Sequence, residues 1–95
     1  MSAELLFTDA ARWQLRSAIE TLRRSGAPVA RAFVADVAAR LRNPTALGRE
    51  ARPLAEWPDL PFREIRIDGY RFFVVEKDGT RWIAGVWNVN RTEPS

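Results

Sequence analysis

The sequence predicts an α+β fold: an N-terminal strand, then a helical hairpin, then a three-stranded antiparallel meander, with the strands forming one twisted sheet. The meander is indicated by Asp-Gly pairs at 68–69 and 78–79, which separate runs rich in Ile, Val, Phe and Trp. Asp-Gly between such runs favours a tight hairpin turn. The helical hairpin is indicated by two stretches with apolar residues at helical spacing on either side of Ser25-Gly26.

The N-terminal half supplies the first strand and the two helices. Residues 3–7 form a short apolar run that ends at Thr8-Asp9, a pair typical of a helix N-terminus. The apolar face of the first helix contains Ala11, Leu15, Ala18, Ile19 and Leu22, and that of the second contains Ala30, Phe33, Val34, Val37 and Leu41. Asn43-Pro44 ends the second helix. Trp13 lies off the core face of the first helix, so it either packs on the second helix, which we favour, or is left for contact with a partner.

Residues 43–61 are predicted to form an irregular connection, because they hold four of the chain's 6 prolines. A connection of this length is uncommon in a small domain and is often functional. We expect it to lie along the sheet, with the side chains of Leu54, Trp57 and Leu60 packed against the sheet. Residues 89–95 show no apolar period and are predicted to be a flexible tail. The chain is therefore expected to form one domain, residues 1–95.

The alternation of side chains along the meander assigns each residue to one face of the sheet. Two-residue turns pair Ile67 with Tyr70 and Lys77 with Thr80. The core face is then expected to contain Ile65, Ile67, Tyr70, Phe72, Val74, Ile83 and Trp87. The other face is mixed, and it is expected to contain Phe62, Glu64, Arg66, Arg71, Phe73, Val75, Trp82, Ala84, Val86 and Asn88.

On the mixed face, this register places Arg66 directly opposite Arg71. Like charges opposed across two strands destabilise the pair, and a broken local rule often marks a functional site. One interpretation is an anion site in which the two guanidinium groups converge on a phosphate or carboxylate. The other is that Glu64, diagonal to Arg71, neutralises the cluster, or that the register differs by one residue.

Composition excludes several classes of protein. The 95 residues are 46% hydrophobic, enough for one small core, and they include neither cysteine nor histidine. Disulfides, the usual zinc sites and imidazole catalysis are therefore excluded, and no metal or cofactor is expected. No stretch approaches the ~18 apolar residues that span a bilayer, so we expect a cytoplasmic protein without a membrane partner.

The charge balance indicates the kind of partner. The formal net charge is +3, and Lys77 is the only lysine among 15 basic residues. Arginine favours planar, bidentate contacts to phosphate and carboxylate groups. These features favour a nucleic acid or an acidic protein as the partner.

The order of the elements coincides with short groups of residues: Asn43-Pro44, Gly48-Arg49, Pro53-Leu54, Phe62-Arg63-Glu64-Ile65, Gly69-Tyr70-Arg71 and Val86-Trp87-Asn88. In this order and spacing they resemble the RelE/ParE family of bacterial toxins over nearly the whole chain. The resemblance implies the toxin of a type II toxin-antitoxin module, which inhibits growth, is neutralised by a cognate acidic antitoxin and meets DNA only through that antitoxin. RelE-like members cleave mRNA on the ribosome, and ParE-like members inhibit DNA gyrase without ordinary catalysis.

The resemblance also implies site residues. Arg71 matches the arginine that contacts the scissile phosphate in RelE-like nucleases, and Arg66 matches a basic position on the preceding strand. The expected catalytic residues are Arg66, Arg71 and Glu64, and the expected nucleic-acid contacts are Arg49, Arg52, Arg66, Arg71, Asn88 and Arg91. Nuclease members commonly carry His or Tyr near the end of the last strand, where this chain has Asn88-Val89. Some also carry a glutamate where this chain has Arg52.

Metal-free RNA cleavage needs a proton acceptor, cations for the developing charge and an acid for the leaving group. The arginines supply the cations, and Glu64, Glu50 or Glu56 is left as the proton acceptor. Whether the protein is an enzyme therefore stays open. The leading hypothesis from sequence is a ribosome-dependent endoribonuclease. The alternatives are a ParE-like inhibitor of DNA gyrase and a degenerate toxin that binds only its antitoxin and DNA.

Overall fold

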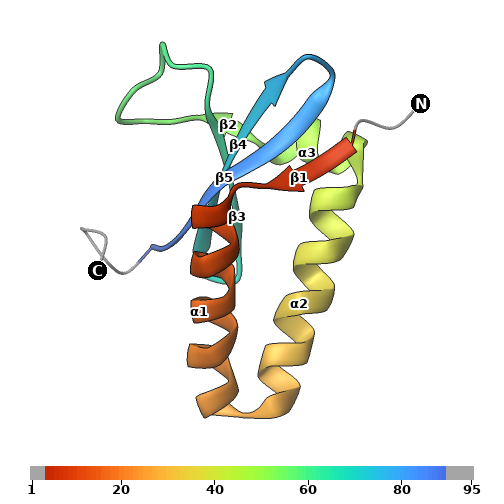
Figure 1. Ribbon diagram of the computed structural model, residues 1–95, viewed down its shortest axis with the longest axis vertical. Coiled ribbons are helices and arrows are strands. Elements are labelled where there is room, and N and C mark those ends of the chain that lie inside the picture. Colours follow the sequence, from red (N-terminus) through yellow and green to blue (C-terminus); the bar gives the residue numbers. More distant parts are fainter. Residues whose placement is uncertain (1–3, 90–95) are drawn as a thin grey trace.

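A computed structural model describes the chain from residue 4 to residue 89, and Figure 1 shows its arrangement. The elements are β1 (Glu4–Phe7), α1 (Asp9–Ser25), α2 (Ala27–Arg42), α3 (Pro44–Glu50), β2 (Arg52–Pro53), β3 (Arg63–Ile67), β4 (Tyr70–Lys77) and β5 (Thr80–Asn88). One sheet has the strand order β1-β5-β4-β3-β2. β1 runs parallel to β5, and the other pairs are antiparallel. The predicted α+β fold is confirmed, with β2 added at one edge of the sheet.

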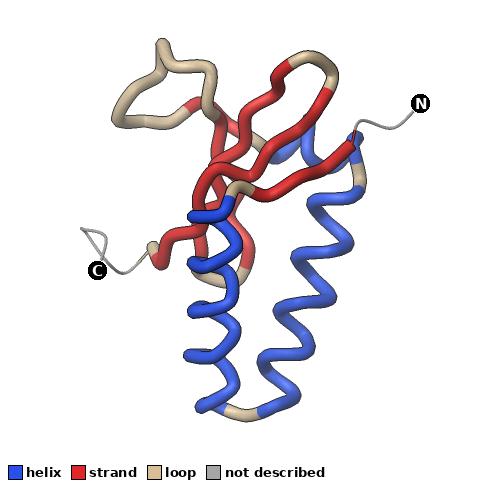
Figure 2. The backbone as a smooth tube through the Cα atoms, viewed as in Figure 1, coloured by secondary structure: helices blue, strands red, loops and turns tan. Residues whose placement is uncertain are grey.

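The two long helices lie side by side, and their connecting turn extends beyond the sheet (Figure 2). Thr8 is the N-cap of α1 and accepts a hydrogen bond from the Ala11 amide at 3.1 Å. Gly26 ends this helix with φ 136°, a value that favours glycine, and Pro28 lies in the first turn of α2. The helix ends therefore follow from local residue chemistry, as predicted.

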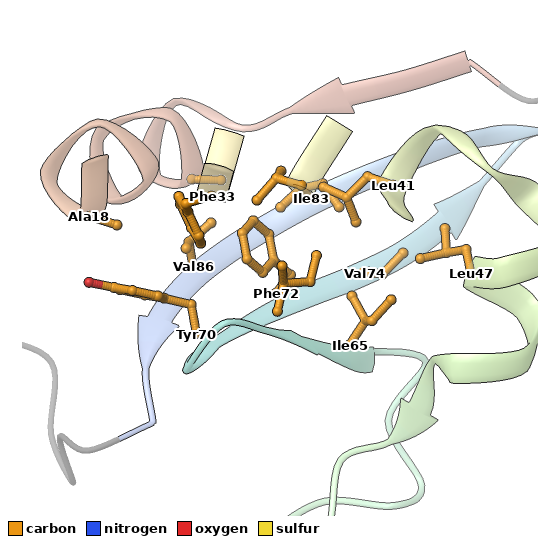
Figure 3. Close-up of a cluster of buried hydrophobic side chains, with 13 residues drawn as sticks. Ala18, Phe33, Leu41, Leu47, Ile65, Tyr70, Phe72, Val74, Ile83 and Val86 are labelled. Carbon is orange, nitrogen blue, oxygen red and sulfur yellow. The ribbon is translucent and has the colours of Figure 1, made fainter. Parts of the chain in front are cut away.

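The hydrophobic core lies between the helices and one face of the sheet (Figure 3). The ring of Phe33 in α2 lies next to two rings of β4. The centroid of the Phe33 ring is 5.3 Å from that of Tyr70 and 6.3 Å from that of Phe72. The expected apolar faces of both helices pack on this core, except that Val34 is 45% exposed and Ala30 is buried outside the cluster. The expected packing of Trp13 on α2 is wrong, because Trp13 is 70% exposed and lies against Arg16 of its own helix.

A β-bulge in β5 changes the face assignment at the end of the meander. Phe73 pairs with Gly85 and Val74 with Ile83, which leaves Ala84 as an extra residue. One extra residue moves every later side chain to the opposite face. Val86 is therefore buried in the core at 4% exposure. The expected positions of Trp87 in the core and of Val86 on the mixed face are both wrong.

Two polar side chains stabilise this bulge, one from α1 and one from its N-cap residue. The Val86 amide donates a hydrogen bond to Gln14 Oε1 at 2.7 Å, and the Thr8 hydroxyl donates to the Ala84 carbonyl at 3.3 Å. These bonds satisfy backbone groups at the irregular part of the ladder. These two bonds connect α1 to the bulge in β5, and the bulge places Trp87 on the mixed face.

The connection between α2 and β3 is more ordered than predicted. Its first part forms α3 and the two-residue strand β2, where an irregular segment was expected. Leu54 is buried, as expected, but Trp57 is 61% exposed and Leu60 45% exposed, so their predicted packing is wrong. Within residues 4–89, no helix is long and apolar enough to cross a membrane.

Both Asp-Gly turns have the predicted register, and Gly69 has φ +84° with no atom within 4 Å of an added Cβ. Replacing Gly69 with alanine should lower the unfolding free energy by about 1 kcal/mol or more, because the strain is in the backbone. Thermal denaturation of Gly69→Ala measures this loss. Gly48→Ala is the control, since Gly48 lies in α3 with open space around it, and alanine favours helix there. Equal melting temperatures for the two variants would contradict the turn assignment.

Candidate functional site

The candidate site lies on the mixed face of the sheet, where β3 and β4 place Arg66 opposite Arg71 in the predicted register. The two arginines differ in environment, because the Arg71 side chain is 16% exposed and that of Arg66 is 66% exposed. The Arg71 guanidinium carbon also lies 5.0 Å from the centre of the Phe73 ring. Arg71 is therefore held against the sheet, whereas Arg66 reaches into solvent.

Glu64 joins the two arginines. Arg71 Nε donates a hydrogen bond to Glu64 Oε2, and Arg66 Nε lies 3.6 Å from Glu64 Oε1. The Glu64 side chain is only 13% exposed. A carboxylate with this little exposure needs such partners to offset the loss of hydration. Glu64 thus screens the repulsion between Arg66 and Arg71.

A second carboxylate reaches Arg71 from the loop between β2 and β3. Glu56 Oε2 and Oε1 accept hydrogen bonds from Arg71 Nη1 and Nη2, both at 2.9 Å. This is the bidentate geometry in which arginine binds carboxylates most strongly. The hydrogen bond from Arg71 lowers the pKa of Glu56, and the bond to Glu56 raises the pKa of Arg71. Glu56 is therefore a carboxylate held in its ionised form.

An aromatic pair lies beside the charged groups. The rings of Phe73 and Trp87 meet edge to face, with centroids 5.4 Å apart. Because of the bulge in β5, Trp87 lies opposite Arg71 in the strand pairing. The mixed face therefore combines Glu64, Arg66 and Arg71 with a half-buried aromatic surface.

Only some of the other residues that were expected to contact nucleic acid lie at this site. Arg52 lies opposite Glu64 in the pairing of β2 with β3, which places it on the same face. Asn88 lies opposite Tyr70, so the bulge moves it away from the mixed face, where it was expected. Arg49 is exposed at the end of α3. Arg91 and the tail from residue 90 onward lie outside the described residues.

The glutamates differ in their positions. Glu50 contacts Arg40 of α2 at 3.7 Å and is not part of the Arg71 cluster. Glu56, which sequence reasoning offered only as one of three proton acceptors, instead makes the bidentate contact to Arg71. No sequence pattern relates these two residues, because a loop separates them along the chain. Within the part of the chain that the structure describes, no group of three or more acidic residues could hold a metal ion.

A cavity of about 360 Å³ lies apart from these residues, between α3 and the hairpin of β4 and β5. Its polar lining includes Arg63, Glu76 and Arg81, and Arg81 Nη2 bonds to Glu76 Oε1 at 2.9 Å. None of the predicted site residues lines it. The predicted site is therefore separate from this cavity.

Near the site, Asp68 occupies the turn between β3 and β4 with φ 50°. Partial desolvation, and then the neighbouring Asp36 carboxyl, raise the pKa of Asp68, while Arg40 opposes this shift. An acid whose pKa is raised by folding destabilises the fold as pH rises from about 4 through the folded-state pKa. The penalty is therefore present at neutral pH and disappears in acid.

Asp68→Asn should accordingly stabilise the protein at pH 7 by up to about 0.5 kcal/mol, because the side chain is exposed and screened. Urea denaturation at pH 7 and at pH 3 measures this effect. Asp78→Asn is the matched control, since Asp78 has φ 53° in the other Asp-Gly turn. The difference between the two variants should be present at pH 7 and vanish at pH 3. A difference that is independent of pH would rule out the carboxyl pair as its cause.

The fold is similar to those of two solved toxin-antitoxin structures. The first, a chromosomal ParDE system from P. aeruginosa, gives a TM-score of 0.70 at 17% identity, covering 92% of this chain and 96% of the other. The second, the RelBE2 toxin-antitoxin complex from Mycobacterium tuberculosis, gives 0.59 at 23% identity, covering 98% and 95%. No curated protein matches the chain significantly.

The family follows from the sequence itself. Residues 5–92 match the family described as the ParE toxin of the type II toxin-antitoxin system parDE. The chain therefore belongs to this family of toxins, within the RelE/ParE group that the sequence resembles.

Proposed function

We propose that this toxin inhibits growth by binding DNA gyrase and that it does not cleave RNA by itself. The observation that carries the proposal is that Glu64 and Glu56, the two carboxylates beside Arg71, are both held in ion pairs with arginine. A general base must be able to accept a proton near its operating pH. Glu56, which is bound bidentately to Arg71, has a lowered pKa and is a weak base, and Glu64 already accepts a hydrogen bond from Arg71, so this arrangement disfavours RNA cleavage by the toxin alone.

The remaining candidates for proton transfer do not replace these carboxylates. Tyr70 is the only tyrosine, and it is 8% exposed with its ring against Phe33. Histidine is absent from the sequence. The membership of the chain in the ParE family supports the same conclusion, since ParE-like toxins act on gyrase.

Ribosome-dependent mRNA cleavage is the second candidate function. It is favoured by the position of Arg66 opposite Arg71, a pair that would stabilise charge developing on a phosphate. Glu64 would be the proton acceptor in this mechanism, and the ribosome would position the message. The exposed side chains of Arg49 and Arg52 would contact the RNA.

The proposed partner in neutralisation is an acidic antitoxin. This proposal is supported by the family and by the two similar structures, which are toxin-antitoxin systems. The net charge of +3 favours an acidic partner, and exposed apolar side chains such as Trp13 offer contact area. Copurification of a small acidic protein encoded beside the toxin gene tests this point. If none copurifies and expression alone does not slow growth, the toxin assignment fails.

A supercoiling assay with purified components tests the gyrase proposal. Purified toxin should block supercoiling of relaxed plasmid by DNA gyrase and should increase the amount of cleaved plasmid. Adding the antitoxin first should abolish both effects, whereas topoisomerase I, the control enzyme, should be unaffected. Unchanged supercoiling at a toxin excess that stops growth in cells would exclude gyrase as the target.

A further inference from the structure

Arg71 has two kinds of carboxylate partner. Glu64 bonds to Nε, lies on β3 and is 13% exposed, so it is a fixed part of the sheet. Glu56 bonds to Nη1 and Nη2, and its side chain is 44% exposed. The two outer nitrogens of the guanidinium therefore hold a ligand that lies at the surface.

The loop that carries Glu56 is loosely attached. Leu54 at the start of the loop is buried, but after Glu56 the side chain of Trp57 is 61% exposed and that of Leu60 is 45% exposed, so neither of these fixes the loop in the core. Few buried apolar contacts in a segment mean that it opens at low cost. Arg71 itself stays in place when the loop opens, because Glu64 and the Phe73 ring hold it.

From this arrangement we propose that the outer edge of the Arg71 guanidinium is a binding site for one carboxylate of a partner protein, and that Glu56 occupies it in the toxin alone. The partner's acidic side chain enters by displacing Glu56 and the loop around it. Glu56 is thus an internal competitor that weakens partner binding. The guanidinium is already positioned before the partner arrives, which lowers the entropic cost of binding.

The charges of the cluster indicate which ligand fits. Arg66 and Arg71 are balanced by Glu64 and Glu56, and Arg52, opposite Glu64 in the strand pairing, adds a positive charge to this face. The cluster is therefore cationic once Glu56 withdraws, and the ligand that it already holds is a carboxylate bound in the bidentate geometry. The rings of Phe73 and Trp87 lie beside Arg71 and offer apolar contact to residues that flank the carboxylate. The toxin's own Ala55-Glu56-Trp57 has this composition.

A peptide with the sequence of residues 54–58, Leu-Ala-Glu-Trp-Pro, acetylated and amidated, is a suitable probe. Titration into the full-length toxin is followed by the ¹⁵N NMR signal of the Arg71 Nε–H group. Glu56→Gln should bind the peptide about fivefold more tightly than the wild type, because an exposed ion pair no longer competes for the site. The same peptide with Gln in place of Glu should not bind. Thermal denaturation confirms that each variant is folded.

Glu76→Gln is the matched control. It removes the same charge and breaks a similar contact, since Glu76 is 63% exposed and bonds to Arg81 at 2.9 Å. Its affinity for the peptide should equal that of the wild type. Equal affinity for Glu56→Gln and the wild type, or binding to neither, would overturn the proposal. Tighter binding of a dinucleoside monophosphate than of the peptide to Glu56→Gln would show a nucleic-acid ligand and would also overturn it.

The inference depends on the proposed function only in taking the ligand to be a protein. The titration uses the purified toxin and a peptide, without gyrase. A negative result in the supercoiling assay would therefore not affect the result of the titration. Likewise, a negative titration would not contradict the gyrase proposal.

Discussion

Replacing Val86 with aspartate should unfold the domain, whereas the same replacement at Trp87 should leave it folded. Val86 is 4% exposed within the core cluster, and among residues 4–89 no cation is buried there to pair with a carboxylate. Burying an unpaired charge is among the few changes that cost more than about 4 kcal/mol. Small domains are stable by about 5–15 kcal/mol, so this loss removes much or all of the stability. Circular dichroism at 25 °C and urea denaturation measure it.

Trp87→Asp is the control for the face assignment. Trp87 is half-buried on the mixed face, where its ring meets Phe73 edge to face. Loss of such an aromatic pair costs about 0.5–1.5 kcal/mol beyond the area that it buries. The new carboxylate would lie opposite Arg71, which can pair with it. If Trp87→Asp unfolds the protein and Val86→Asp does not, the bulge in β5 is misplaced.

Arg71→Ala should abolish growth inhibition and should also lower stability by about 1–3 kcal/mol. Arg71 makes the hydrogen bond to Glu64, whose side chain is 13% exposed, and removing one member of such a pair leaves a poorly hydrated carboxylate. Repulsion between the opposed arginines alone would predict the reverse, but Glu64 already screens that repulsion. Arg66→Ala should keep the stability within about 0.5 kcal/mol, because Arg66 is 66% exposed.

Loss of function must be separated from loss of stability in these variants. Arg71→Ala combined with Glu64→Gln removes both members of the pair and should recover much of the stability, because no buried charge remains. Toxicity should stay absent in this double variant, as measured by colony counts after induction. Arg71→Lys keeps the charge but lacks the bidentate geometry, so it should be only partly toxic. A fully toxic, stably folded double variant would show that Arg71 has no direct role.

The predictable parts of this fold are those with local chemical signals. Asp68-Gly69 and Asp78-Gly79 define their turns because tight hairpin turns need positive φ, and all four residues have it. These turns fix the register that places Arg66 opposite Arg71. The helix ends at Thr8 and Gly26 are equally local.

The parts that sequence reasoning missed depend on weaker or non-local signals. Gly85 within a strand pattern is typical of a bulge, and an alanine Cβ there would lie 3.0 Å from Phe73 Cδ2. Pro44 also suits the first turn of a helix, so it marks the start of α3 as well as the end of α2. The contact of Glu56 with Arg71 has no such signal, because it depends on the path of a loop.

The most direct test of the proposed mechanism is to map nucleic-acid breaks in growing cells after the toxin is induced. Sequencing of mRNA 5′ ends and of double-strand DNA ends in the same culture compares the two targets. We expect intact messages together with double-strand breaks in DNA and a DNA-damage response. With the Arg71→Ala/Glu64→Gln variant, neither the DNA breaks nor the DNA-damage response should occur. Cuts within the codons of translated messages, with intact DNA, would contradict the gyrase proposal and would identify a ribosome-dependent nuclease.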